Sequence, residues 1–446
     1  MTTSQDPGLR ETLPLPTDRA DAAPVADAPS PARLLRNRSY MLLMTGLTAE
    51  TLGAGVALFA VPLVAYGLTG SVVQAGVVAA VGQVGALLAT LPAGVVADRV
   101  DRRRLVVAAA GVGTLLWTTV AVAAGLGALT TWHLAAALFG ASVVGALVDP
   151  ATSGAFRSVV PVPQLPTALA AAQGRDAAAG LLAGPLGGVL YAVSHAIPLA
   201  AAAVGHLATA VCTWLVREPL NGDVAEARAT RPVAALREGL LFVWSVPLFR
   251  ALLGLFVVVN VAFGGLMIGI NLELVRTGTT PVLIGLVDLA VGLGVLVGAV
   301  LAPRLVGRFR AGALVVVALG VLATGAVAMA LLQSYVAYLV VLPPAVLLVP
   351  AVNAGLSGYA AAITPAQMQG RLASVLGLTG LAAGPLVPLV GSGLLARYGI
   401  GTALAVLAGL LVVTVAGLST SRSLWRVGTP DTWADDARAL AEAAPR

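Results

Sequence analysis

Residues 94–104 of this chain are Gly-Val-Val-Ala-Asp-Arg-Val-Asp-Arg-Arg-Arg, a charged stretch at the junction of two apolar runs, residues 72–97 and 105–126. Each run is long enough to cross a bilayer as an α-helix, which takes about 20 apolar residues. The stretch is therefore typical of a short basic loop between two membrane-spanning helices.

The composition of the whole chain agrees with this interpretation. Of its 446 residues, 58% are hydrophobic and 10% are charged, whereas about 25% are charged in soluble domains. The three histidines and the single cysteine have no metal-ligand spacing. The chain has no lysine, so it lacks the lysine of an ATP-binding loop. We expect no enzymatic activity, no metal and no cofactor.

The apolar runs predict an all-α polytopic membrane protein with twelve transmembrane helices. Each run spans about 30 Å at 1.5 Å per residue. The runs lie near residues 40–67, 72–97, 105–126, 132–157, 166–193, 198–216, 249–274, 282–302, 311–332, 335–361, 372–395 and 401–420.

The arginines predict the orientation of the bundle. They precede the first run and then gather in every second loop, whereas only Arg276 and Arg397 fall in the opposite loops. Cytoplasmic loops of membrane proteins carry such an excess. We therefore expect both termini in the cytoplasm and the protein in the cell membrane, and the pattern argues against nucleic acid as a partner.

Polar stretches divide the chain into five parts. Residues 1–35 lack the apolar core of a signal peptide and predict a disordered cytoplasmic tail, and residues 421–446 predict a second tail. Residues 217–248 predict a cytoplasmic linker with an amphipathic helix at 237–244. The linker separates two six-helix bundles, 36–216 and 249–420.

Two short repeats relate the bundles. Ala-Gly-Pro-Leu at 183–186 recurs at 383–386, and Pro-Ala at 150–151 recurs at 350–351. One common spacing in corresponding spans predicts a duplicated bundle.

The loop sequence resembles the signature Gly-x-x-x-Asp-Arg-x-Gly-Arg-Arg of the major facilitator superfamily. Its matching residues are Gly94, Asp98, Arg99, Arg102 and Arg103, while Asp101 replaces the second glycine. The resemblance covers about residues 34–420 and implies two six-helix pseudo-repeated halves that rock around a central cavity. It implies a conformational gate in which Asp98 caps a helix or pairs with an arginine across the halves. The alternative is a solvated loop that only sets orientation.

Further segments are similar to the branch that contains the enterobactin exporter and the macrolide efflux proteins. They include residues 68–71, 149–151 and 237–244. In the fifth span, Gly180, Gly184, Pro185 and Gly188 are similar to the antiporter motif of drug and proton exchangers, although Val189 replaces its last glycine. This similarity implies export, and the alternative is a packing seam of small residues.

Four ionisable residues lie inside the predicted spans of the first half: Glu50, Asp149, Arg175 and Asp176. At 1.5 Å per residue, all lie roughly 12–16 Å from the arginine-rich ends of their helices. We expect Arg175 to neutralise Asp149 on the adjoining helix, or else to pair with Asp176. Burial disfavours the charged form of an unpaired acid, which suits a proton carrier. Glu50, Asp149, Asp176 and, in the second half, Asp288 are therefore candidates for proton coupling. For Asp149, which precedes Pro150 and Ala151, the alternative is a structural residue that braces the loop that follows.

Glu50 is the first of these candidates and also a candidate for the substrate cavity. The first span lines the central cavity in the family that the chain resembles, and no arginine is adjacent to Glu50. The alternative is a structural acceptor bonded to Thr48, Thr51 or a nearby backbone group.

The asparagines within the spans have two possible roles. Asn260 and Asn353 are candidates for the substrate cavity or for hydrogen bonds between helices. His206 and Cys212 are interpreted as packing residues.

These expectations favour a secondary active transporter that performs proton-coupled efflux of a drug-like or natural-product molecule by alternating access. A cavity with acids and amides but one arginine suits a neutral or cationic amphiphile. The expected partners are this small molecule, protons and the lipid bilayer, and we expect a monomer. The alternatives are a facilitated uniporter of a small nutrient and a non-transporting membrane sensor or assembly partner.

Overall fold

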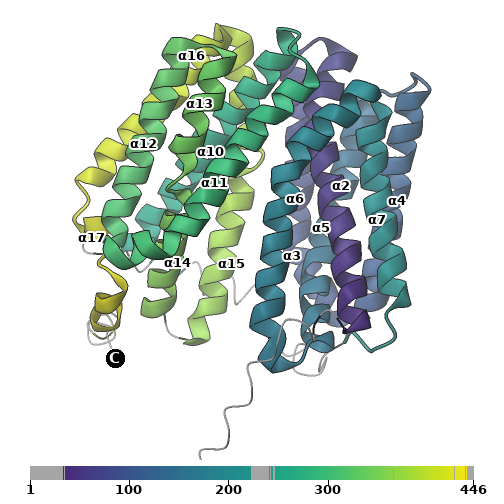
Figure 1. The fold of residues 1–446 in the computed structure, drawn as a ribbon, viewed down its shortest axis with the longest axis horizontal. Helices are drawn as coiled ribbons and strands as arrows, with labels where there is room; N and C mark the ends of the chain where they lie inside the picture. Colours follow the sequence, from purple (N-terminus) through teal and green to yellow (C-terminus); the bar gives the residue numbers. More distant parts are fainter. Residues whose placement is uncertain are drawn as a thin grey trace, which may run out of the picture.

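The computed structural model describes residues 34, 36–221, 241, 243–244, 247–364, 366–425, 427–436 and 438, and every element of regular structure in these ranges is a helix (Figure 1). Most of the predicted tail 1–35 and of the predicted linker helix 237–244 lies outside the described residues. The all-α prediction is confirmed.

The first half consists of six long helices that match the predicted spans closely. Four of them begin at a side chain that accepts a hydrogen bond from an amide of the first turn, namely Asn37, Ser71, Asp101 and Thr130. The helices are α2 (Arg38–Thr69), α3 (Val72–Arg99), α4 (Arg102–Gly125), α5 (Thr131–Val159), α6 (Leu165–Val193) and α7 (Ala196–Leu215).

In the second half, some predicted spans are divided between two helices. Its helices are α10 (Pro247–Arg276), α11 (Pro281–Arg308), α12 (Ala311–Leu332), α13 (Tyr335–Val346), α14 (Val349–Ile363), α15 (Ala366–Ala383) and α16 (Leu386–Ser419), followed by the short α17 (Arg422–Trp425). Together α13 and α14 occupy the predicted span 335–361.

Eleven segments of the described chain are long and apolar enough to cross a membrane, and the last of them accounts for two predicted spans. It covers 40 residues, Gly380–Ser419, about twice the length that one crossing needs. Within it, Gly399 has φ 76° and ψ 172°, a left-handed backbone that glycine adopts without steric cost. α16 is therefore two helices that meet at Gly399. The first, together with α15, covers the predicted span near 372–395, and the second covers the span near 401–420.

The bundle has two distinguishable ends. α2 begins at the lower end in Figure 1. Because α3 runs back from the other end, its junction with α4, which carries Arg99 and Arg102–Arg104, lies at this lower end as well. We call it the arginine-rich end and the other the opposite end.

Glycines allow two seams between the halves, and both seams lie toward the opposite end. In the α6–α11 seam, a methyl group on Gly188 would lie 2.5 Å from the carbonyl oxygen of Pro281, and one on Gly285 would overlap the carbonyl of Gly184. In the α3–α16 seam, a methyl group on Gly76 would lie 2.8 Å from the carbonyl oxygen of Pro388. The halves are thus in backbone contact at the opposite end.

Part of the predicted C-terminal tail belongs to the core of the second half. Leu424 is 1% exposed and Val427 is fully buried, and both pack with the helices of that half. The amides of Ala311 and Gly312 at the start of α12 donate to the carbonyls of Gly428 and Val427 at 3.2 Å each. This segment therefore closes the arginine-rich end of α12.

Candidate transport pocket

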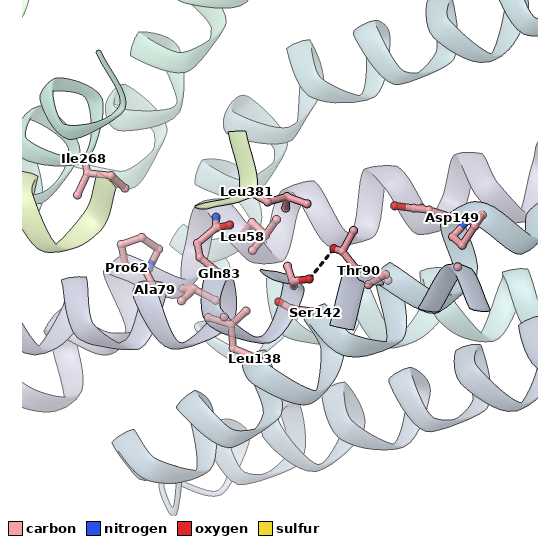
Figure 2. A pocket seen from close by; sticks show the side chains of 17 residues that line it. Leu58, Pro62, Ala79, Gln83, Thr90, Leu138, Ser142, Asp149, Ile268 and Leu381 are labelled. Atoms are coloured by element: carbon pink, nitrogen blue, oxygen red, sulfur yellow. Dashed lines mark hydrogen bonds between the residues drawn. The ribbon is translucent and has the colours of Figure 1, made fainter. Parts of the chain in front are cut away.

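A cavity of about 640 Å³ lies between the halves, lined mainly by α2, α3 and α5 of the first half (Figure 2). Ile268 of α10 and Leu381 of α15 are its lining residues from the second half. Its walls are mostly apolar; the lining residues are Leu58, Val61, Pro62, Ala79, Gly82, Gln83, Ala86, Thr90, Gly94, Leu138, Ser142, Gly145, Ala146, Asp149, Pro150, Ile268 and Leu381. An apolar concavity with few polar groups is typical of sites for small organic molecules.

Four lining residues carry polar side chains: Gln83, Thr90, Ser142 and Asp149. The Thr90 hydroxyl donates to the carbonyl of Ala86 at 2.6 Å, so its donor is already used (Figure 2). Figure 2 shows Asp149 at one end of the pocket and Ile268 at the other. Asp149 is thus the ionisable lining residue.

The pocket extends from the level of the seams toward the arginine-rich end. Gly94 and Asp149 line it, and they lie about 8 Å and 15 Å from the arginine-rich ends of α3 and α5 by helical rise. The seams close the molecule on the opposite side. Among the described residues, the backbone contacts between the halves thus lie on one side of the pocket, and the pocket reaches toward the other.

The structure brings the four predicted charges of the first half together. The charges of Glu50, Asp176 and Arg175 act on Asp149, from α2 and α6. Of these residues, only Asp149 lines the pocket. The cluster therefore places one carboxylate against the cavity and the other charges behind it.

The expected pairing of Arg175 with Asp149 is wrong. The Nε and Nη2 atoms of Arg175 instead donate to Oδ1 of Asp176 at 3.0 and 2.7 Å. The side chains of Arg175 and Asp176 are 14% and 52% exposed, and together they form a charge-assisted pair within one helix. Within the described part of the chain, Arg175 forms its ion pair with Asp176, the alternative partner, and none with Asp149.

Glu50 has a basic partner that its neighbours in sequence did not suggest. Its Oε1 lies 3.0 Å from Nδ1 of His206, with side chains 12% and 6% exposed. Thr48 and Thr51 instead donate to carbonyls of their own helix, and Glu50 Oε2 is buried without a hydrogen-bond partner. Nδ1 of His206 also has no hydrogen-bond partner among the described residues, so the two side chains are in contact and form an ion pair when the imidazole is protonated.

Close packing of three helices holds this pair. A methyl group on Gly205 would lie 2.6 Å from the carbonyl oxygen of Ala49, so α2 and α7 are in backbone contact beside Glu50. On α4, a methyl group on Gly113 would lie 2.9 Å from the ring of His206. The pair is thus sealed inside the first half, outside the residues that line the pocket.

The candidates of the second half do not line the pocket. Asp288 lies at the α6–α11 seam, where a methyl group on Gly184 would lie 2.7 Å from its Cβ, and Asn271 donates to it at 3.4 Å. Asn260 donates to the carbonyl of Phe256 in its own helix, and the side chain of Asn353 is exposed. Asn260 therefore forms this bond within α10, not to a neighbouring helix.

The residues of the signature loop have different positions. Gly94 lines the pocket, and a methyl group there would meet nothing within 4 Å, so no other described helix packs closely against this glycine. Arg99 is exposed, whereas Arg102 and Arg103 bind residues that follow α7. The side chain of Asp98 lies outside the described part of the structure.

The antiporter-like motif lies on continuous α6. Gly184 and Gly188 form the α6–α11 seam, while a methyl group on Gly180 would meet nothing within 4 Å. Pro185 lies inside the helix, which continues to Val193. The motif thus provides a surface on which the two halves touch.

Gln83 and Ser142 were not predicted as site residues. A glutamine within an apolar span is itself unusual, because an amide costs free energy in a membrane unless it is bonded or faces a cavity. That signal was available for Gln83. Serine is too common in membrane helices to mark a site.

The family follows from a sequence comparison. The sequence model of the Major Facilitator Superfamily matches residues 43–386. The chain belongs to the major facilitator superfamily. It is therefore an integral membrane protein of a transporter family.

Relatives and solved structures agree with this assignment. The chain is 27% identical over 377 residues to the multidrug efflux pump Tap of Mycolicibacterium fortuitum, which covers 79% of this chain and 87% of that protein.

Its fold is similar to the nucleoside transporter NupG in its D323A form, with a TM-score of 0.68, 12% identity and coverage of 85% and 99% of the two chains. It is also similar to a bacterial homologue of the human lysosomal transporter Spinster, with a TM-score of 0.65, 16% identity and coverage of 92% and 99%. At these identities the structures establish the major facilitator fold alone.

Proposed function

We propose that this major facilitator protein exports an amphiphilic, neutral or cationic small molecule from the cytoplasm across the cell membrane in exchange for protons. The observation that carries the proposal is the apolar pocket with Asp149 at its arginine-rich end. Similarity to an efflux pump supports the direction, and the arginine pattern supports a cytoplasmic arginine-rich end.

The pocket suggests how exchange proceeds. A cationic amphiphile places its apolar body against the leucines and its charge near the Asp149 carboxylate. Proton binding to Asp149 from outside removes that attraction and favours release, and loss of the proton to the cytoplasm restores it. Glu50 with His206, Asp176 and Asp288 remain further candidates for proton coupling. The loop of residues 98–104, which we call the gate loop, is a candidate for control of the exchange.

The test of coupling uses everted vesicles and a pH-sensitive dye, with cationic dyes, macrolides and catecholate siderophores as probes. We expect one class of probe to release protons in the wild type. The Asp149→Asn variant should lose this release about tenfold or more, because no titratable group remains at the pocket wall. The control is Asp431→Asn, the same change at an exposed residue outside the pocket.

A second variant tests the pocket itself. A side chain on Gly145 would meet no atom within 4 Å and would enter the cavity, so Gly145→Phe should block transport of a large probe. The matched control is Gly409→Phe, at an exposed glycine of α16 with equal space and no part in the pocket. Probe movement without proton release would favour the uniporter, and equal transport in both glycine variants would exclude this pocket as the route.

A further inference from the structure

The residues that follow α7 bind the gate loop, and Asn221 makes two of these hydrogen bonds. Oδ1 of Asn221 accepts a hydrogen bond from the backbone N–H of Arg102 at 2.9 Å. Its Nδ2 donates to Oδ2 of Asp101, also at 2.9 Å. The other oxygen of Asp101 accepts from the backbone N–H of Arg104 at 2.9 Å. Asp101 therefore caps α4 and holds the start of the linker at the same time.

Two arginines of the gate loop add bonds to the same segment. Nη1 of Arg102 donates to the carbonyl of Leu220 at 3.3 Å, and Nη2 of Arg103 donates to the carbonyl of Glu218 at 2.6 Å. Gly154 of α5 makes room for the first of these, since a methyl group there would lie 2.6 Å from Cζ of Arg102. Three consecutive residues of the gate loop thus bind the linker.

Two helices of the first half complete the contact. Ser158 of α5 donates to the carbonyl of Leu220 at 3.0 Å, and Ser39 of α2 donates to the carboxylate of Glu218. Leu220 is 2% exposed. All of these partners belong to the first half, so the described part of the linker is bound to that half as far as Asn221.

Asp101, which makes this contact possible, is a departure from the family signature. The signature that the loop resembles has glycine there, and glycine has no side chain with which to bind the linker. The chain runs from Asn221 to α10 of the second half, and the bonds of Asn221 join it to the first residues of α4.

We propose that Asp101 and Asn221 are positioning residues of the transport cycle: together they anchor the linker on the gate loop and couple motion of the second half to the start of α4. The pair stays closed throughout the cycle, because α2, α4 and α5 move as one half. The proposal deepens the proposed transport function and rests on its rocking motion.

The test exchanges the two side chains. In Asp101→Asn two amide donors face each other, and in Asn221→Asp two carboxylates do, so each single variant loses the bond. In the double variant Asp101→Asn/Asn221→Asp, the new amide donates to the new carboxylate, which still accepts from the N–H of Arg102. The bond is restored in reverse with the net charge of the wild type.

Two readouts separate this proposal from the proposed function. The first is the maximal rate of probe export, expected to fall about tenfold in the single variants at unchanged half-saturation and to recover in the double variant. The second needs no cargo: the thiol of Ser392→Cys, placed in a Cys212→Ala background, reacts with an external maleimide when the α3–α16 seam opens, since Ser392 is 1% exposed.

We expect slow labelling in the single variants and wild-type labelling in the double variant. If no probe is exported by any variant but labelling follows this pattern, the anchor holds and the proposed cargo or coupling fails. Equal labelling in the wild type and both single variants overturns the anchor. A well-folded double variant that is labelled as slowly as the single variants also overturns the anchor. If the single variants do not fold, Asn221→Ala, which only removes the bond, takes their place.

Discussion

The ion pair of Glu50 and His206 is a buried pair whose members come from helices far apart in the sequence. Removal of His206 would leave the Glu50 carboxylate buried without a partner. We expect His206→Ala to lower the free energy of unfolding by roughly 3–5 kcal/mol. Glu50→Gln in the same chain should recover part of this loss, because a glutamine carries no charge. Unfolding of the purified protein in detergent measures both effects, and simple additivity would contradict the pairing.

Glu218 makes a pH-dependent contact outside the spans. The hydrogen bond from Ser39 lowers the pKa of the Glu218 carboxyl below its ordinary value of 4.5, with Arg103 contributing. A lowered pKa stabilises the fold above the ordinary value and loses this contribution as pH falls through the lowered one. Wild type should therefore exceed Glu218→Gln in melting temperature at pH 7 and match it well below pH 4. A constant difference over this range would exclude the titration of Glu218.

At the residue scale, the sequence predicted which side chains matter better than which ones meet. The depths of Glu50, Asp149, Arg175 and Asp176 followed from helical rise alone, and the structure brings these residues together. Arg175 pairs with Asp176 and not with Asp149, and Glu50 contacts His206. Both results depend on how the helices are rotated about their axes. Hydropathy contains no such information.

At the scale of single helices, the repeated sequences have different structures in the two halves. Ala-Gly-Pro-Leu lies within continuous α6 in the first half, whereas at 383–386 it separates α15 from α16. Likewise Pro150 lies within α5, and Pro350 lies in the first turn of α14. Proline is tolerated inside a helix or at its start, so the tertiary environment decides between the two. The duplication was predictable, and the breaks in the second copy were not.

The glycines of the α6–α11 seam permit a prediction about the halves. A methyl group on Gly285 would overlap the carbonyl of Gly184, and such overpacking typically costs 1–3 kcal/mol, about 5- to 150-fold in population. We expect Gly285→Ala to favour the state in which the seam is open and to speed labelling of the Ser392→Cys thiol. The control is Gly393→Ala, where a methyl group meets nothing within 4 Å. Unchanged labelling in Gly285→Ala would show that the seam does not govern access.

On the scale of the whole molecule, the twelve spans and two halves followed from composition and arginine placement, because the bilayer imposes span length and orientation. Which end of the bundle is closed did not follow, since it depends on contacts between halves that hydropathy does not encode. The C-terminal segment was also misjudged as only a tail, although Leu424 and Val427 are core residues.

Removal of residues 422–446 tests the importance of that segment. Loss of two buried aliphatic side chains and of the caps on α12 should destabilise the protein by roughly 2–4 kcal/mol. Removal of residues 439–446 alone leaves every described contact in place and is the control. Thermal unfolding in detergent compares the two proteins, and equal melting temperatures would mean that the segment adds no stability.

The bonds between the start of α12 and residues 427–428 have a consequence for synthesis. About 115 residues separate the amides of Ala311 and Gly312 from their acceptors, and at 5–20 residues per second the ribosome takes about 6–23 s to make them. During that interval this end of α12 is in the membrane without its final partners. The second half therefore completes these contacts only after the C-terminal segment has been synthesised.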